Sequence, residues 1–357
     1  MENAAENRID IKSMNLAELT ELIVGFGEKS FRAKQIYQWL HVKQVSSFDE
    51  MTNISKSLIE KLKENCRLVC LKQEAVQISK IDGTRKYLFL LEDGNVIESV
   101  LMRYKHGNSV CISSQVGCRM GCRFCASTLD GLVRGLTPSE MLDQIYRIGS
   151  DIGERISNVV VMGTGEPMDN FDNLLKFTEL LTDENGLNIS QRNLTVSTCG
   201  IVPKIRELAE KKLQITLALS LHASTQEKRL KLMPVANKYE IHEVIEACRY
   251  YFEQTGRRVT FEYSLVNGVN DTKEDANELT ALVKGMNCHI NLIPVNPIKE
   301  RNYVQPSGER VRDFKNKLEK NGINVTFRRE MGRDINGACG QLRKSYNETK
   351  KTKEGES

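Results

Sequence analysis

Residues 118–125 read Cys118-Arg-Met-Gly-Cys122-Arg-Phe-Cys125, three cysteines separated by three and then by two intervening residues. Thiolates bind iron–sulfur clusters, and a [4Fe–4S] cluster usually takes four of them. No fourth cysteine lies close by in the sequence, so three thiolates would leave one iron open to a ligand that is not protein. The reductive cleavage of S-adenosylmethionine requires such an open iron, and this chemistry is the first hypothesis.

A zinc knuckle, or a set of incidental cysteines, is the alternative interpretation of the same stretch. Structural zinc usually has four ligands, often arranged as two paired hooks, and no second hook follows nearby. Gly117 and Gly121 suit a loop that wraps around a compact ligand, because glycine adopts backbone conformations that other residues resist. The open cluster is therefore the favoured hypothesis, which the surrounding fold must support.

The composition is ordinary for a globular chain. Its 357 residues suffice for a large domain with a smaller accessory one, or for a single elaborated barrel. No apolar run approaches the roughly 20 residues of a membrane helix, and the N-terminus lacks a signal-peptide core. We therefore expect a cytoplasmic protein with no membrane contact, whose ten cysteines serve metal or redox chemistry. A net charge of +4 indicates an anionic partner only weakly.

The residues before the cysteine stretch are expected to form two small units. Helical periodicity from Leu16 to Leu62 predicts three short helices, which would make residues 1–70 a small helical accessory domain. The following β-rich sequence carries an Asp82-Gly83 turn signal. It predicts a β-hairpin extension over residues 71–108.

Strands then alternate with helices, which is typical of an α/β fold with parallel strands and right-handed crossovers. The expected strands are 109–113, 158–162, 194–197, 215–220, 259–265 and 289–294. About six units predict a partial (βα)6 TIM-like barrel over residues 109–300. Chemistry in such barrels lies at the carboxyl ends of the strands, where the cysteine loop follows the first strand. Residues 301–345 would form a C-terminal segment, and 346–357 a disordered tail.

Small and polar residues follow several expected strands at this same end. In Gly163-Thr-Gly165-Glu166-Pro167 the glycines would admit a ligand close to the backbone, and Glu166 could accept a hydrogen bond from an ammonium group such as that of S-adenosylmethionine. Other strand ends carry Ser197, Ser220-Leu221-His222 and Asn296. These suit ribose hydroxyls and adenine edges, although each taken singly also fits an ordinary turn or cap.

Two further cysteines stand apart from the triplet. Cys111 lies on the strand that enters the cysteine loop, and Cys339 lies in Asn336-Gly-Ala-Cys339-Gly340. Free cysteines are often small buried apolar residues. Cys339 fits that interpretation poorly, because a loop flanked by glycines is expected to be exposed.

Together these features resemble the RlmN family of dual-specificity RNA methyltransferases, within the radical S-adenosylmethionine (radical SAM) superfamily. The resemblance covers nearly the whole chain. Its most specific elements are Cys111-Ile-Ser-Ser-Gln-Val-Gly-Cys118, the cysteine triplet, Gly163–Pro167 and Ala338-Cys339-Gly-Gln-Leu342. It implies an enzyme that methylates C2 of an adenine in 23S ribosomal RNA, and we expect transfer RNA to be modified as well. The implied cofactors are one [4Fe–4S] cluster and two molecules of S-adenosylmethionine per turnover.

The resemblance also implies a role for each candidate residue. Cys339 would be the methyl-carrying nucleophile, Cys111 the resolving thiol, and Glu98 a proton acceptor near the base. The cluster ligands would be Cys118, Cys122 and Cys125, and the S-adenosylmethionine site would be lined by Gly165, Glu166, Ser197, Ser220, Leu221, His222 and Asn296.

In the implied reaction, Cys339 takes a methyl group from one S-adenosylmethionine, and a 5′-deoxyadenosyl radical from a second one removes a hydrogen atom from that methyl group. The carbon radical adds to C2 of the adenine and Glu98 accepts the C2 proton. Attack of Cys111 on the sulfur then releases the RNA and leaves a transient Cys111–Cys339 disulfide. An electron donor such as flavodoxin would reduce the cluster, and we expect the enzyme to be a monomer.

Basic residues are the expected RNA contacts. We expect Arg103-Tyr-Lys-His106, Arg119, Arg123 and Arg134 around the cluster mouth, and Arg328, Arg329 and Arg333 beside Cys339. The adenine itself would have to be unstacked to enter a barrel.

Three alternatives remain open. The nearest is methylation of the same adenine at C8; Pro167 resembles the C2 enzymes better, although Met168 departs from their usual leucine. An activase that makes a glycyl radical would need neither Cys111 nor Cys339. A non-catalytic, metal-stabilised RNA-binding protein would hold zinc instead of a cluster.

Overall fold

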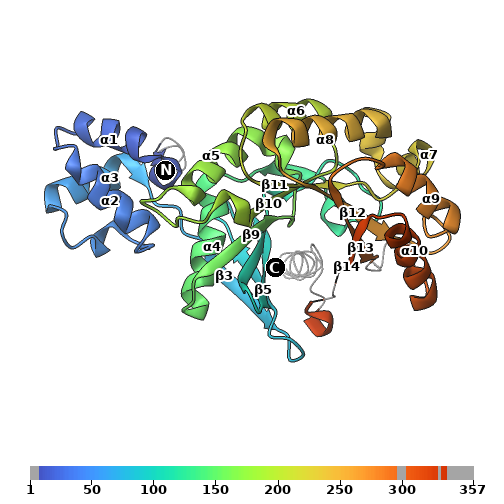
Figure 1. Cartoon of the computed structure of the whole chain (residues 1–357). Helices are drawn as coiled ribbons and strands as arrows, with labels where there is room; N and C mark the ends of the chain where they lie inside the picture. Colours follow the sequence, from blue (N-terminus) through green and yellow to red (C-terminus); the bar gives the residue numbers. More distant parts are fainter. Residues whose placement is uncertain (1–7, 296–302, 329–330, 336–357) are drawn as a thin grey trace.

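The computed structural model describes residues 8–295, 303–328 and 331–335. Its main feature is a ten-stranded mixed sheet with helices along its outer side and a small helical unit beside it (Figure 1). The parallel strands are β6 (Gly107–Ile112), β9 (Ile156–Val161), β10 (Leu194–Thr198), β11 (Thr216–Ser220), β12 (Val259–Leu265), β13 (Cys288–Pro294) and β14 (Asn324–Phe327). Each pairs in parallel with the next in this order. Valine, isoleucine and leucine dominate several of them, as expected for strands that are covered on both faces.

Helices connect the consecutive parallel strands. They are α4 (Pro138–Ile152), α5 (Phe171–Thr182), α6 (Val202–Glu210), α7 (Gln226–Leu232), α8 (Ile241–Thr255), α9 (Lys273–Leu282) and α10 (Gly308–Lys320). Helix α4 has clear local causes: Thr137 and Glu140 form a capping box at its start, and Gly153 ends it with a φ of 63°.

The expected partial (βα)6 barrel is confirmed, with one correction at its end. The sequence-based series of parallel strands ended at residue 294, but β14 also pairs in parallel with β13, so it is a seventh strand after the sixth helical crossover.

The expected β-hairpin forms and continues the barrel sheet. Strands β3 (Lys72–Ile78), β4 (Arg85–Leu90) and β5 (Val96–Tyr104) pair antiparallel in succession, and β5 pairs antiparallel with β6. The predicted Asp82-Gly83 turn joins β3 to β4, and Gly83 has the positive φ of 73° that the turn requires. The sheet therefore runs without interruption from β3 to β14.

The N-terminal unit contains the three predicted helices, α1 (Leu16–Gly25), α2 (Phe31–His41) and α3 (Lys56–Asn65), together with the short parallel pair β1 (Ile9–Asp10) and β2 (Cys66–Arg67). It lies to one side of the barrel, near α4 and α5 (Figure 1). A fully buried ion pair joins the two parts: Lys12 Nζ lies 2.8 Å from Asp143 Oδ1 on α4, and both side chains are 0% exposed. One apolar core extends through both parts.

Within the described ranges, none of the helices has both the length and the apolar character that crossing a bilayer demands.

Candidate active site

The cysteine loop is held beyond the carboxyl end of β6 by a small sheet of its own. Strand β7 (Gln115–Gly117) pairs antiparallel with β8 (Leu132–Gly135), which closes residues 118–131 into a loop. The N–H of Cys118 donates to the carbonyl oxygen of Gly131 at 2.8 Å. Gly117 has a φ of 77°, and a Cβ there would collide with that same carbonyl, so the loop needs glycine at this position.

The three cysteines of the triplet lie near one another in an apolar setting. Cys122 packs against Leu232 and Met233, with Phe124 and Cys125 beside them. Burial raises the pKa of the Cys118 thiol to about 12 and raises that of Cys122 as well, and the nearby Cys125 acts on both in the same direction. Binding to positively charged iron would offset this cost of forming thiolates away from water.

These residues fit an iron–sulfur cluster. Three soft thiol ligands come from one short loop and influence one another electrostatically. Among the described residues, no three His, Cys, Asp or Glu side chains are grouped so that they could hold a single metal ion. A four-iron cluster does not need such a group, because each thiolate binds a different iron.

The Gly163–Pro167 loop lies against β7. Gly165 has a φ of 113°, and a Cβ there would come within 2.6 Å of Gln115 Cβ, so only glycine fits. Burial raises the pKa of the Glu166 carboxyl group, although its two oxygens accept hydrogen bonds from the N–H groups of Met168 (3.1 Å) and Cys199 (2.7 Å). Because each carboxylate oxygen has a further lone pair, acceptance from an ammonium group stays a prediction that this geometry allows.

Two of the predicted residues meet across adjacent strands. Ser197 on β10 and Ser220 on β11 are half-buried, and their hydroxyl oxygens lie 3.5 Å apart. The backbone N–H groups of Leu221 and His222 both donate to the carbonyl oxygen of Glu262 on β12, at 3.0 and 3.2 Å. These contacts fix the end of β11 beside β12.

The His222 side chain links this strand end to the cysteine loop. Its ring packs edge-on against Phe124, with ring centroids 4.6 Å apart. Its Nδ1 accepts from the N–H of Ser264 at 2.9 Å. Burial, with a contribution from the Arg229 cation, lowers the pKa of His222 to about 3, so the ring is neutral near pH 7. Because Nδ1 accepts, the proton of the neutral ring lies on Nε2, which is therefore a hydrogen-bond donor and not a base.

Cys111 and Glu98 lie on the same, inner face of the sheet. Ser99 on β5 donates a hydrogen bond to Gln144 on α4, so its neighbour Glu98 points away from the helices. Val100 follows on the same face as Glu98 and is directly opposite Cys111 on β6. The resolving-thiol and proton-acceptor roles stay predictions, but their two side chains share one surface.

Glu98 has a partner that the sequence analysis missed. Lys86 on β4 is 0% exposed, and its Nζ lies 3.2 Å from Glu98 Oε2, which is 3% exposed as a side chain. The only sign of this pair in the sequence was that a lysine begins the apolar run Lys86-Tyr-Leu-Phe-Leu90. A charge within a buried strand requires an opposite charge nearby, although the sequence does not say which one.

A second missed residue is Arg229 on α7, which is also fully buried. Its Nη2 donates to the carbonyl oxygen of Cys199 at 2.6 Å, and its positive charge acts on the Cys122 thiol to lower its pKa, against the larger effect of burial. The neighbouring sequence gave no sign of this placement, because Arg229 belongs to an exposed-looking stretch of charged residues.

The predicted basic contacts are only partly where the sequence placed them. The turn after Arg103 joins β5 to β6 at the amino end of β6, opposite the cysteine loop, so the prediction that Arg103–His106 borders the cluster mouth is wrong. Arg119 pairs with Asp169, and Arg134 pairs with Asp93 and Glu140. Asn296, Arg329 and Cys339 lie outside the described residues.

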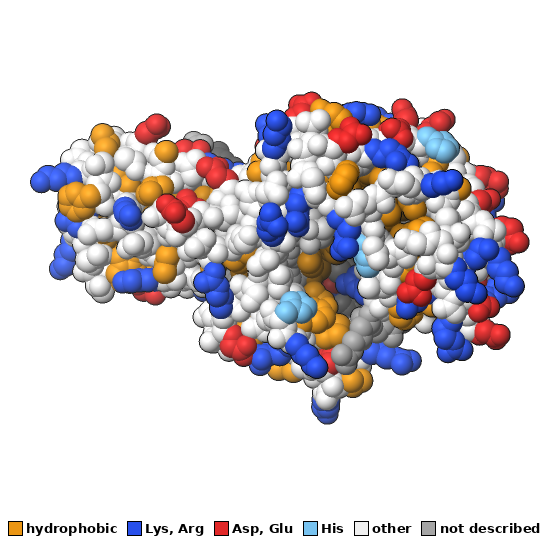
Figure 2. Space-filling model, in the orientation of Figure 1, with side chains coloured by type: hydrophobic (Ala, Val, Ile, Leu, Met, Phe, Trp, Pro, Cys, Tyr) orange, Lys and Arg blue, Asp and Glu red, His pale blue; other side chains and the backbone are white. Residues whose placement is uncertain are grey.

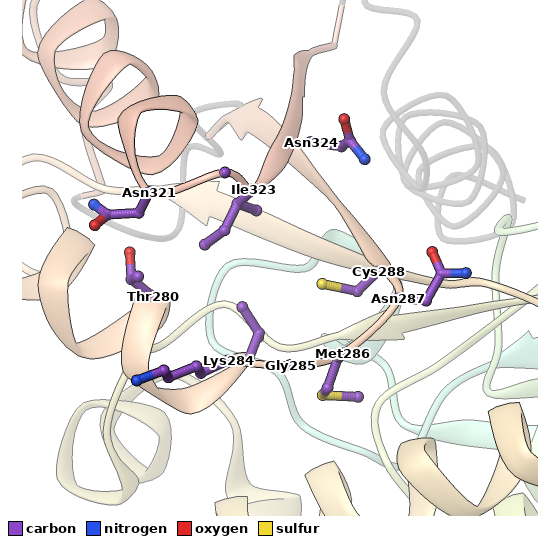
Figure 3. Close-up of a pocket in the computed structure, with 11 residues that line it drawn as sticks. Thr280, Lys284, Gly285, Met286, Asn287, Cys288, Asn321, Ile323 and Asn324 are labelled. Carbon is purple, nitrogen blue, oxygen red and sulfur yellow. The ribbon is translucent and has the colours of Figure 1, made fainter.

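Figure 2 shows a hollow in one face of the molecule, between the part of the sheet that holds β5 and the part that holds β13, with hydrophobic side chains inside and basic side chains at its edge. A different, shallow pocket of about 170 Å³ is drawn in Figure 3. It is lined by residues such as Cys288 and Asn324, at the amino ends of β13 and β14. It therefore lies at the end of the sheet away from the cysteine loop and is not part of the candidate site.

Known proteins match this chain over the same regions. Residues 9–68 match the ribosomal RNA large subunit methyltransferase N-terminal domain, and residues 112–280 match the radical SAM superfamily. A probable dual-specificity RNA methyltransferase RlmN of Lachnospira eligens is 70% identical over 339 residues, which cover 95% of this chain and 97% of that protein. Its counterpart in Clostridium novyi is 58% identical over 337 residues, 94% of this chain and 98% of that protein.

The chain belongs to the RlmN family of radical SAM methyltransferases.

A solved structure agrees with membership of the RlmN family. The crystal structure of a radical SAM methyltransferase from Sphaerobacter thermophilus has a TM-score of 0.89 and 41% sequence identity, and covers 93% of this chain and 98% of that one. The predicted cofactors, a [4Fe–4S] cluster and S-adenosylmethionine, are those of this superfamily and are confirmed at that level. An RNA substrate likewise follows from the RlmN family.

Proposed function

We propose that this enzyme methylates C2 of an adenine in 23S ribosomal RNA and also in transfer RNA. The observation that carries the proposal is the inner face of the sheet, where Cys111 and the buried Lys86–Glu98 pair lie on neighbouring strands. A thiol that can attack sulfur and a carboxylate that can take up a proton are the two groups that release of a methylated base from a cysteine carrier requires. High identity to relatives named RlmN favours C2 over C8.

The cofactors have a corresponding set of residues in this proposal. Cys118, Cys122 and Cys125 would hold the cluster, which supplies the electron for splitting S-adenosylmethionine. Glu166 would accept from the ammonium group of that molecule, with Gly165 letting it approach the backbone. Its sugar and base would lie against Ser197, Ser220, Leu221, His222 and Asn296.

The other residues act on the methyl group and the base. Cys339 would take a methyl group from S-adenosylmethionine by nucleophilic displacement and carry it to the adenine. Glu98 would accept the C2 proton, with Lys86 holding its carboxylate in place at 3.2 Å. Cys111 would then attack the sulfur of Cys339, which releases the RNA and forms a disulfide that cytosolic thiols can reduce.

An anaerobic assay with unmodified ribosomal RNA tests the reaction. We expect 2-methyladenosine and 5′-deoxyadenosine to appear together, with iron in the protein and no requirement for zinc. Detection of 8-methyladenosine would favour the alternative activity at C8. Absence of any methylated adenosine alongside zinc in place of iron would favour the non-catalytic RNA-binding protein.

Variants of the two cysteines test their separate roles. Cys111→Ala is expected to accumulate a covalent protein–RNA adduct, visible as a shifted band under denaturing conditions, because the crosslink is not resolved. Cys339→Ala is expected to transfer no methyl group to RNA. Cys288→Ala is a matched control, because Cys288 lies at the opposite end of the sheet. An active Cys339→Ala enzyme, or no adduct with Cys111→Ala, would refute the respective role.

The proposal also includes a flavodoxin-type electron donor, a cytoplasmic location and a monomeric enzyme. Light scattering after size-exclusion chromatography would test the last of these directly. Reduced flavodoxin is expected to support 5′-deoxyadenosine formation, and failure to do so would require a different reductant.

A further inference from the structure

The turn between β3 and β4 contacts a segment that follows it by more than 250 residues. Ser79 Oγ donates to Asp334 Oδ1 at 2.6 Å, and the backbone N–H of Lys80 donates to Asp334 Oδ2 at 2.8 Å. Both carboxylate oxygens of Asp334 are therefore held by one turn. Figure 1 shows the short red piece that contains Arg333–Ile335 beside the end of this hairpin.

In a third hydrogen bond the C-terminal segment is the donor and the turn is the acceptor. The N–H of Gly332 donates to Asp82 Oδ2 at 3.0 Å. Gly332 has a φ of 63°, and a Cβ there would lie 3.0 Å from Thr84 Cγ2, so the close approach favours glycine. Three hydrogen bonds thus join two short segments, with donors and acceptors on both sides.

The turn does not depend on the C-terminal segment for its own hydrogen bonds. Ser79 Oγ accepts from the N–H groups of Ile81 (3.1 Å) and Asp82 (3.3 Å), which leaves its O–H to donate outward. Asp82 Oδ1 accepts from the N–H of Thr84 at 3.0 Å, and its Oδ2 is the atom that meets Gly332. The turn therefore presents a preformed set of groups to the segment.

The same segment reaches the inner face of the sheet one residue earlier. Met331 packs against the small apolar cluster of Val100, Met102 and Cys111. The described part of the C-terminal segment is thus fixed at two points, by the turn and beside Cys111.

We propose that the β3–β4 turn is a docking site for the C-terminal segment, and that Ser79, Asp82 and Asp334 are positioning residues that keep Cys339 within reach of Cys111. The effect on Cys339 rests on the proposed function, whereas docking itself is inferred from these contacts alone.

Chain length gives the size of the effect. Cys339 follows Asp334 by five residues, so it lies within about 17 Å of this anchor even when the chain is extended. Without the turn contacts, the last fixed point is Met331, which packs beside Cys111 and precedes Cys339 by eight residues. The effective concentration of a tethered group falls roughly as the −3/2 power of tether length. Docking should therefore raise the local concentration of Cys339 by about twofold.

The test compares Asp334→Ala and Ser79→Ala with Asp313→Ala, a control at an exposed position of α10. Oxidised glutathione is added to the reduced full-length protein, and the rate of Cys111–Cys339 disulfide formation is followed by mass spectrometry. We expect both docking variants to form it about twofold more slowly than wild type and the control to form it at the wild-type rate. An unchanged rate in the docking variants would overturn the positioning role.

Hydrogen exchange separates docking from the cysteine chemistry. In Asp334→Ala the amide of Lys80 loses its acceptor and should exchange faster, whereas Asp313→Ala should leave it unchanged. Unchanged exchange in Asp334→Ala would overturn docking, whatever the enzyme methylates. Faster exchange in a protein that makes no methylated adenosine would instead support docking and refute the proposed function.

Discussion

Lys86 and Glu98 form a buried ion pair on the inner face of the sheet, next to the proposed site of reaction. Each charge is almost completely removed from water, and each is stabilised by the opposite charge of the other. The ion pair joins the neighbouring strands β4 and β5, and it fixes the direction in which the Glu98 carboxylate points. This geometry makes Lys86 a positioning residue for the proposed proton acceptor.

Replacing Lys86 should therefore affect both stability and reaction. We expect Lys86→Met to lower the free energy of unfolding by about 3 kcal/mol, because it removes a cation that lies 3.2 Å from a buried carboxylate. We also expect Cys339-bound adduct to accumulate, because proton removal would be impaired. Urea unfolding and gel analysis of RNA adducts measure these effects.

Lys231→Met is the control for this substitution. Lys231 pairs with Glu227 on the surface, where the side chains are 62% and 79% exposed, so its loss should change the free energy of unfolding far less than the loss of Lys86. Equal stability losses in the two variants would contradict the assigned role of burial.

The buried His41 ring predicts how the stability of the protein depends on pH. Burial, with the nearby Lys12 charge, lowers the pKa of His41 to about 3 in the folded protein, against an ordinary value near 6.5. The folded state therefore keeps this ring neutral while the unfolded state takes up a proton, so stability is lost as pH falls from about 6.5 toward 3. Between pH 7 and 5.5 this group should account for about 1 kcal/mol. His41→Phe should show a correspondingly smaller loss in urea unfolding; an identical pH dependence would contradict the assignment.

At the scale of elements, the cysteine loop depends on the β7–β8 pair and on one glycine. Gly117→Ala should distort the loop, because it places a side chain at positive φ against the carbonyl of Gly131. We expect iron and sulfide content to fall severalfold with little change in far-ultraviolet circular dichroism. Gly131→Ala is the matched control, because its φ is also positive but open space surrounds it. Full cluster content in Gly117→Ala would show that the loop tolerates the change.

The sequence predicts those elements whose cause is local. The glycine-flanked cysteine loop, the Asp82-Gly83 turn and the helical pattern after Leu16 all carry their own signals, and all three formed as expected. The pairing of β14 with β13 was not predicted, because these two strands are separated along the chain by α10 and the residues around it. The prediction for Arg103 failed for a related reason, because closeness in sequence to the cysteine loop was taken as closeness in space.

At the scale of the whole molecule, the N-terminal unit is fixed to the barrel through the Lys12–Asp143 pair. Asp143 Oδ2 also accepts from the N–H of Leu71, and Lys12 Nζ also donates to the carbonyl oxygen of Val69. These contacts tie the residues before and after the three helices to α4. The unit is thereby held in one orientation beside α4.

Breaking this joint should loosen the N-terminal unit without removing it. Lys12→Met is expected to lower the free energy of unfolding by about 2 kcal/mol, because the buried Asp143 loses one charged hydrogen-bond donor but keeps Arg147, whose Nε lies 3.2 Å from its Oδ2. Limited proteolysis should then cut near residues 66–71 faster than in wild type. Lys176→Met, which affects a half-exposed pair with Glu18, is the control. Unchanged cleavage in Lys12→Met would mean that the apolar core alone holds the unit.

Within residues 8–295, 303–328 and 331–335, strands β3 and β14 are the two ends of the strand order, so the described strands form an open sheet and not a closed ring. The described strands alone would therefore not require a polynucleotide to be threaded through a ring. Selection of the substrate would then depend on which folded RNA can present an unstacked nucleotide between the two edge strands. Under the proposed function, RNAs that differ as much in size as a ribosomal precursor and a transfer RNA could both do so.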